Sequence, residues 1–192
     1  MRHFKLALRP MCLLTLVAAV LLTGNPAMAD GADTCAGPIP DIAPLPFQDN
    51  GDTRGATNFI TNGGMGLPYP YDGEDHVYQV TLYTGNAVDF VLDLAGSTGD
   101  LALFLLTDCD DPTSLVAHSE DWIGPGAGPE QILYSEWGEY APGTYYLWID
   151  SYYAVGHPAS AGTYTLSVTG VLPEPAALSL LVVGGLVLLR RR

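Results

Sequence analysis

The sequence predicts an all-β protein: a single β-sandwich of the jelly-roll type, flanked by an N-terminal signal-peptide helix and a short C-terminal hydrophobic helix. Between residues 51 and 170, short runs of alternating apolar and polar residues are separated by Gly, Pro, Asn and Asp, which is typical of strands and turns. Outside the two terminal segments, no ten-residue window has the 3.6-residue period of an amphipathic helix. About 120 residues are enough to bury one core.

Five runs are expected to form strands: 76–83, 87–94, 101–106, 143–150 and 162–168. In four of them every second residue is apolar, so one face is expected to point into the core. The expected core residues are Tyr78, Val80, Leu82, Val88, Phe90, Leu92, Leu94, Tyr145, Leu147, Ile149, Tyr164, Leu166 and Val168. The run 101–106 is apolar throughout, which predicts a central strand covered on both sides.

The chain divides into four segments on composition. Residues 1–29 are expected to be a signal peptide, and residues 30–50, rich in Pro, Ala and Asp, an extended leader. The sandwich occupies residues 51–170, and residues 171–192 form a separate tail.

Charge excludes two classes of partner. The formal net charge is −14, and all 21 acidic residues lie between Asp30 and Leu189, where Arg54 is the single Lys or Arg. Binding to nucleic acid requires clustered basic side chains, so no nucleic-acid partner is expected. The same distribution argues against a body held on anionic lipid by charge.

The N-terminus has the three parts of a secretory signal peptide. Arg2, Lys5 and Arg9 precede an apolar run over residues 11–22, which is too short to span a bilayer. Ala27-Met28-Ala29 then predicts cleavage after Ala29. The alternative is an uncleaved anchor helix.

The C-terminus combines three features in a fixed order. Pro173-Glu174-Pro175 precedes an apolar stretch over 176–189, and the chain closes with Arg190, Arg191 and Arg192. Fourteen helical residues span roughly 21 Å, short of a hydrocarbon core of about 30 Å. The three arginines are expected to hold their end in the cytoplasm.

These residues resemble the PEP-CTERM sorting signal of Gram-negative bacteria. The resemblance implies recognition by an exosortase-type membrane protease that cuts near Pro173-Glu174-Pro175. It also implies transient insertion in the inner membrane and a final location at the cell surface or outside the cell. The general secretion machinery is expected as a partner on other grounds, because the signal peptide has no twin-arginine pair. The alternative is an ordinary C-terminal membrane anchor.

The central region contains five motifs of one further family, at residues 51–58, 75–82, 99–105, 142–150 and 162–166. Together they resemble the bacterial pre-peptidase C-terminal domain. The resemblance implies a β-sandwich accessory module, which in that family is normally attached to a protease. No catalytic domain is attached in this sequence, so an enzyme-linked role does not follow.

Two cysteines remain after signal cleavage. Cys35 and Cys109 are an even pair in an exported chain, which favours one internal disulfide. Two free thiols or an intermolecular bridge are the alternatives.

Acidic residues gather at turns. Asp72, Glu74 and Asp75 surround Gly73, and Asp110 and Asp111 follow Cys109. Carboxylates on loops suit Ca²⁺, so these five residues are candidate calcium ligands. None of the clusters matches the twelve-residue EF-hand loop, and solvated turn carboxylates are the alternative.

Aromatic residues gather on one strand face. Tyr146 and Trp148 lie opposite the core-facing residues of the run 143–150, and Tyr152 continues the same parity. Such rings, if exposed, can stack on sugars or dock a polypeptide. The alternative is that a loop or a second layer covers them.

No catalytic motif is present: Gly-x-Ser-x-Gly, His-Glu-x-x-His and Cys-x-x-Cys are all absent from the sequence. The leading hypothesis is an exported, non-catalytic protein of the cell surface or extracellular matrix with a structural or adhesive role. The second is a carbohydrate- or matrix-binding module for an exopolysaccharide or matrix polymer. The third is a small secreted hydrolase.

Overall fold

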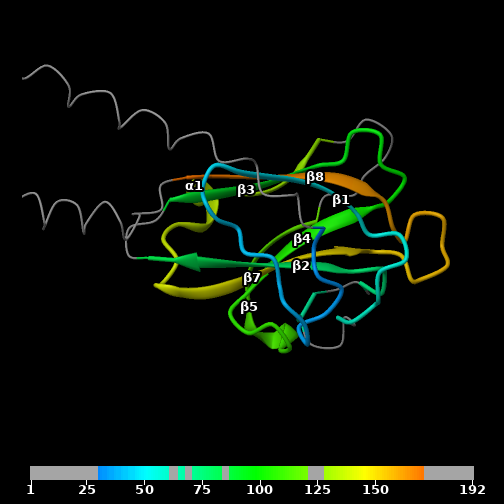
Figure 1. The fold of residues 1–192 in the computed structure, drawn as a ribbon, viewed down its shortest axis with the longest axis horizontal. Coiled ribbons are helices and arrows are strands. Elements are labelled where there is room, and N and C mark those ends of the chain that lie inside the picture. The colour runs from blue at the N-terminus through cyan, green and yellow to red at the C-terminus, as the bar shows by residue number, and fades with distance from the viewer. Residues whose placement is uncertain (1–29, 61–64, 68–70, 84–86, 121–127, 171–192) are drawn as a thin grey trace, which may run out of the picture.

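The computed structural model of the chain describes residues 30–60, 65–67, 71–83, 87–120 and 128–170 (Figure 1). The expected signal peptide with its cleavage site at Ala29, and the expected sorting tail 171–192, lie outside the described residues and stay predictions. Within the described ranges, no helix has the length and apolar character needed to cross a membrane.

The described body is all-β, as predicted, and its strands form two antiparallel four-stranded sheets (Figure 1). One sheet has the order β1-β8-β3-β6 and the other β2-β7-β4-β5. The strand bounds are β1 Phe47–Asp52, β2 His76–Leu82, β3 Val88–Asp93, β4 Leu101–Leu106, β5 Leu115–Ser119, β6 Glu130–Ile132, β7 Gly143–Ser151 and β8 Thr163–Gly170.

The five predicted strands are present with the predicted faces. Between the sheets lies a core of buried side chains that includes all of the expected inward residues except Leu94, which is partly buried at its edge. Every residue of β4 is buried, because side chains cover this strand on both faces. A shift of one residue in any of these strands would move its apolar side chains out of the core, so their registers are strongly fixed.

Three strands were not predicted. β1 lies at the end of the segment expected to be an extended leader, and β5 and β6 are edge strands of five and three residues. β5 buries only Ala117 completely, and β6 buries the charged residue Glu130, so neither run has an apolar alternation to detect. Two short helical turns, η1 Pro112–Ser114 and α1 Tyr134–Trp137, complete the elements.

A second apolar cluster covers the outer face of the β2-β7-β4-β5 sheet. It brings strand residues such as Val77, Phe104 and Trp148 together with Ile60 and Tyr71 from the segment before β2. The leader is tied to the same sheet by a bridge between Ala32 and Val77. The sandwich therefore carries a partial third layer built from segments without regular secondary structure.

The predicted disulfide is present and holds this layer. Cys35 in the leader is bonded to Cys109, just after β4, with the two Cα atoms 5.9 Å apart. Both residues belong to the outer apolar cluster, where Cys109 is buried.

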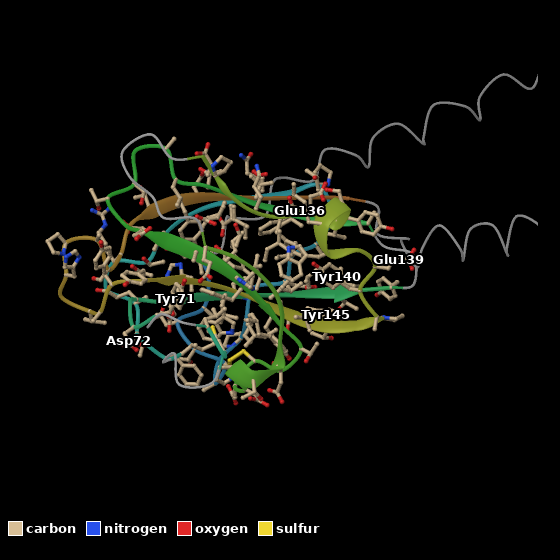
Figure 2. All side chains as sticks on the ribbon, turned by 180° about the vertical axis from the view of Figure 1, so that it is seen from behind. Tyr71, Asp72, Glu136, Glu139, Tyr140 and Tyr145 are labelled. Atoms are coloured by element: carbon tan, nitrogen blue, oxygen red, sulfur yellow. A yellow bond between two sulfur atoms is a disulfide. The ribbon has the colours of Figure 1, made fainter. Side chains whose placement is uncertain are left out.

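The two ends of the sandwich are distinguished by the strands that begin and end there. At one end, here called the Asp75 end, β2, β4 and β8 begin and β7 finishes, whereas β8 leaves the body at the opposite, Gly170 end. Contacts such as that between the His76 and Tyr164 side chains join the two sheets at the Asp75 end. Figure 2 shows Tyr71 and Asp72 at the Asp75 end and Glu139, Tyr140 and Tyr145 towards the other.

Candidate functional site

Two carboxylates face each other at the Asp75 end. His76 pairs with Ile149 in the β2–β7 ladder, so the next opposed positions along the antiparallel register are Asp75 and Asp150. Both have the parity of Val77 and Trp148, which places them on the outer face of the sheet. Both residues are 0% exposed, and their carboxyl groups approach to hydrogen-bonding distance.

Each carboxylate is held by backbone N–H groups through one oxygen. Asp75 Oδ2 accepts from the N–H groups of Phe59 (2.6 Å) and Ile60 (2.8 Å). Asp150 Oδ1 accepts from the N–H groups of Gly73 (3.2 Å) and Ser151 (2.5 Å). The site thus joins three stretches of chain: the segment before β2, the turn that leads into β2, and the end of β7.

The second oxygen of each carboxylate is buried and accepts from no N–H group among the described residues, while the two carboxyl groups lie close enough to share a proton. These atoms are Asp75 Oδ1 and Asp150 Oδ2. Burial raises the pKa of Asp75 to about 6, against the lowering effect of its hydrogen bond with Asp150 and of the N–H groups that it accepts from. Burial, followed by the charge of Asp75, raises the pKa of Asp150 well above its ordinary range.

Two further buried oxygens in the same segments also have no donor among the described residues: Asn58 Oδ1 and Glu74 Oε2. The Asn58 amide nitrogen donates to the carbonyl of Asp72 (2.9 Å), which orients this side chain. The backbone of Asp75 donates to the Thr57 carbonyl (3.1 Å), so the two segments are joined next to the pair. Carboxylate and amide oxygens are the donor set that Ca²⁺ prefers, and the residues fit that ion chemically.

The five predicted calcium ligands divide between two places. Asp72, Glu74 and Asp75 belong to the turn at the Asp75 end, whereas Asp110 and Asp111 follow β4 and are exposed. Asp111 is engaged there, since its Oδ1 accepts from the backbone N–H (2.9 Å) and hydroxyl (2.6 Å) of Thr113 at the start of η1. Asp150 was not predicted, because its partner lies 75 positions earlier in the chain and only the strand register brings them together.

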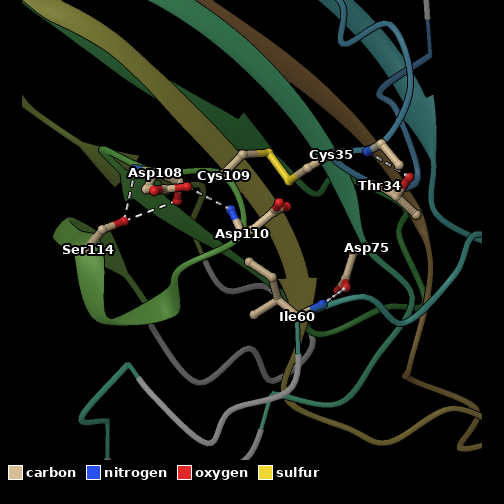
Figure 3. Close-up of a disulfide and its surroundings, with 9 residues drawn as sticks. Thr34, Cys35, Ile60, Asp75, Asp108, Cys109, Asp110 and Ser114 are labelled. Carbon is tan, nitrogen blue, oxygen red and sulfur yellow. Dashed lines mark hydrogen bonds between the residues drawn. A yellow bond between two sulfur atoms is a disulfide. The ribbon is translucent and has the colours of Figure 1, made fainter.

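Asp110 lies next to the disulfide instead (Figure 3). Within the described ranges, Cys35, Cys109 and Asp110 are the one group of three potential ligands whose donor atoms lie within 4.8 Å of one another. Both sulfurs are consumed by the disulfide, so this group offers no thiolate to a metal. Figure 3 also shows the Asp75 carboxylate accepting from the Ile60 N–H.

The predicted aromatic face is not an exposed face. Trp148 is 0% exposed, and the ring of Phe59 stacks on it with 5.9 Å between centroids and 2° between planes. Tyr146 and Tyr152 are half-buried against the same cluster. The parity was correct, and the alternative of a covering layer holds for Trp148, because the segment before β2 packs over it. Trp148 is therefore not accessible for stacking on a sugar, as the carbohydrate-binding hypothesis requires.

A buried polar chain links the two sheets near the same end. Tyr78 donates to Asp49 Oδ2 (2.8 Å), its hydroxyl also contacts that of Tyr164 (2.7 Å), and Tyr164 contacts His76 Nδ1 (2.8 Å). Burial raises the pKa of Asp49 and lowers that of His76. Sequence reasoning placed Tyr78 and Tyr164 in the core but gave no sign that their hydroxyls meet.

One cavity of about 320 Å³ opens beside this polar chain. Its lining includes Asp30, Asn50, Asp52, Asp93, Thr163 and Tyr164. The side chain of Arg54 is bound to Asp52, so the charge of that carboxylate is already compensated.

No family model matches the chain, and no curated protein matches it significantly.

Proposed function

We propose that this protein is an exported, non-catalytic protein of the cell surface or extracellular matrix with a structural or adhesive role, sorted through its C-terminal tail by an exosortase-type system. The proposal includes a folded domain that is a β-sandwich of the jelly-roll type. The orders β1-β8-β3-β6 and β2-β7-β4-β5 support this type, because successive strands up to β8 alternate between the sheets except at β4 and β5.

The observation that carries the proposal is the disulfide between Cys35 and Cys109. Disulfides persist in oxidising compartments and are rare in the cytosol, so this bond supports passage through the inner membrane. The bond joins the leader to the sandwich, which keeps the first residues after the expected cleavage site attached to the body.

Two further features support a surface role. The segment from Asp30 to Gly170 carries twenty acidic residues against Arg54 alone, and such a surface is strongly hydrated and self-repelling. The strand that leads into the expected tail leaves the body at the Gly170 end. A protein held by that tail would therefore direct the Asp75 end outward, away from the membrane.

Mass spectrometry of the protein recovered from its native source tests this proposal. We expect an N-terminus at Asp30, loss of the residues after the Pro173-Glu174-Pro175 motif, and a peptide pair joined through Cys35 and Cys109. Recovery from the cytosol of a chain with Met1 and Arg192 still attached, and with reduced thiols, would refute it.

A further inference from the structure

We propose that the α-ammonium group created at Asp30 by signal-peptide cleavage binds at the acidic cavity beside Tyr164 and fixes the start of the leader to the sandwich. The inference rests on the proposed export, because cleavage after Ala29 is what creates this amine. It does not depend on how the tail is sorted. Asp30 is the first residue that the structure describes, and it is part of the lining of the cavity.

The chain is held in place up to the residue next to this end. Ala32 and Val77 exchange two backbone hydrogen bonds, of 2.9 and 2.8 Å. Gly31 is buried, and the hydroxyl oxygen of Tyr164 lies within hydrogen-bonding reach of its N–H. Successive backbone nitrogens are less than about 4 Å apart, so the amine of Asp30 lies close to that hydroxyl. The position of the new charge is therefore set by the contacts of its neighbours in the chain.

The second position of the processed chain has no room for a side chain. A Cβ on Gly31 would lie 2.7 Å from the Cβ of His76 and 3.0 Å from Cε2 of Tyr78. Both of these residues are buried in β2, so neither can move aside easily. The glycine thus allows the chain end to approach β2 closely, and a larger residue is expected to displace it.

Negative side chains surround the point that the chain end reaches. Asp30 Oδ1 lies 3.9 Å from His76 Nδ1, and Asp33 Oδ1 lies 3.8 Å from His76 Nε2. Burial lowers the pKa of His76, so this imidazole is a poor source of positive charge. The charged and titratable groups facing the chain end are Asp30 and Asp33 in the leader, Asp49 and Asp52 in β1, Arg54, His76 and Tyr78 in β2, Asp93 in β3 and Tyr164 in β8.

The carboxylates at this point lack cations. Asp49 is fully buried, and its Oδ1 has no hydrogen-bond partner among the described residues. The single Lys or Arg between Asp30 and Leu189 is Arg54, and its guanidinium is bound to Asp52. An ammonium group at Asp30 is therefore the further positive charge that the folded body itself can supply.

The sequence allows this amine to be modified selectively. No lysine follows Lys5, so a chain that begins at Asp30 has one primary amine, at its N-terminus. Amine-directed acylation therefore reports on this group alone, and acetylation removes its charge without changing any lysine.

The test uses the exported protein, with its disulfide intact and its N-terminus identified by mass spectrometry. We expect acylation at about pH 8, where an ordinary α-amine is roughly half protonated, to be about fivefold slower in the folded protein than in urea, because nearby carboxylates favour the protonated amine. About 1 M salt should reduce this protection, since the Debye length falls to about 3 Å. Acetylation should lower the melting temperature by about 2 to 4 °C.

Gly31→Ala is the decisive variant, and Gly37→Ala is its matched control, because a Cβ at Gly37 would have nothing within 4 Å. Gly31→Ala should be acylated at nearly the rate of the unfolded chain, and acetylation should leave its melting temperature unchanged. Gly37→Ala should behave as the wild type. If Gly31→Ala failed to fold, a chain that keeps Ala29 as an extra first residue would replace it, since its amine is displaced by one position.

The outcomes separate this inference from the proposed export. Equal acylation rates in the folded and unfolded protein, protection that does not respond to salt, or an acetylated protein that melts with the unmodified one would each overturn the inference alone. An N-terminus other than Asp30 would refute the proposed cleavage and the inference with it.

Discussion

Removing the disulfide with the double substitution Cys35→Ala and Cys109→Ala is expected to destabilise the body strongly. The cross-link closes a loop across 74 positions, and the chain-entropy model gives about 4.5 kcal/mol at 25 °C for a loop of that length. For a body of this size, such a loss corresponds to a fall in melting temperature of roughly 10 to 15 °C. Alanine is the replacement of choice because Cys109 is buried among apolar side chains, where a serine hydroxyl would add its own penalty.

The assay is urea unfolding of three samples: the oxidised wild type, the wild type reduced with dithiothreitol, and the double variant. Because the cross-link acts on the unfolded chain, the variant should also show a larger m value, since its unfolded state exposes more surface. The reduced wild type should match the variant closely, which separates the cross-link from the packing of the sulfur atoms. A loss below about 1.5 kcal/mol with an unchanged m value would refute the reasoning. Such a result would mean that non-covalent contacts alone keep residues 30–50 packed on the sandwich.

Three further predictions concern the outer layer, a close backbone approach and the polar chain. Trp148→Ala should cost about 3 to 5 kcal/mol in urea unfolding, because the residue is fully buried, whereas Phe59→Ala, at a residue 39% exposed, should cost about 1 kcal/mol. Equal losses would contradict the assignment of Trp148 to a core. Gly73→Ala should cost about 1 to 3 kcal/mol in thermal unfolding, since a Cβ would lie 2.4 Å from Ser151 Cβ, while Gly37→Ala, with open space around it, serves as control. Burial raises the pKa of Asp49, so its contribution to stability is full below the ordinary carboxyl pKa near 4 and is lost as the pH rises through the raised value. Asp49→Asn should flatten that decline in urea unfolding at a series of pH values, and an unchanged pH profile would count against it.

The sequence was informative wherever a strand had one buried face. The alternation in β2, β3, β7 and β8 was visible because each strand contributes side chains to one core. The same rule missed β5 and β6, where edge positions bury few side chains and one of them is Glu130. Alternation reports which side chains share a face and says nothing about what lies against it. This is why Trp148 was assigned to the correct face while its exposure stayed open until the covering segment was seen.

The candidate site was only half visible for a related reason. The turn that carries Asp72, Glu74 and Asp75 attracted attention as a local cluster of carboxylates. Asp150 lies in an apolar strand, where a single acid does not form a cluster. The two halves meet only through the register of β2 against β7, which depends on pairing across 75 residues of chain. Local composition carries no information on that pairing.

The position of β8 determines how the body would respond to a mechanical load. This strand is flanked on both sides, by β1 and by β3, and it runs the length of the sheet before the chain leaves at Gly170. Traction on the following segment would act along the strand axis, so the ladders on both sides would resist in shear, with their hydrogen bonds loaded together rather than opened one after another. A tether attached there would transmit drag from flowing liquid or from a neighbouring cell along β8 and into both of its ladders.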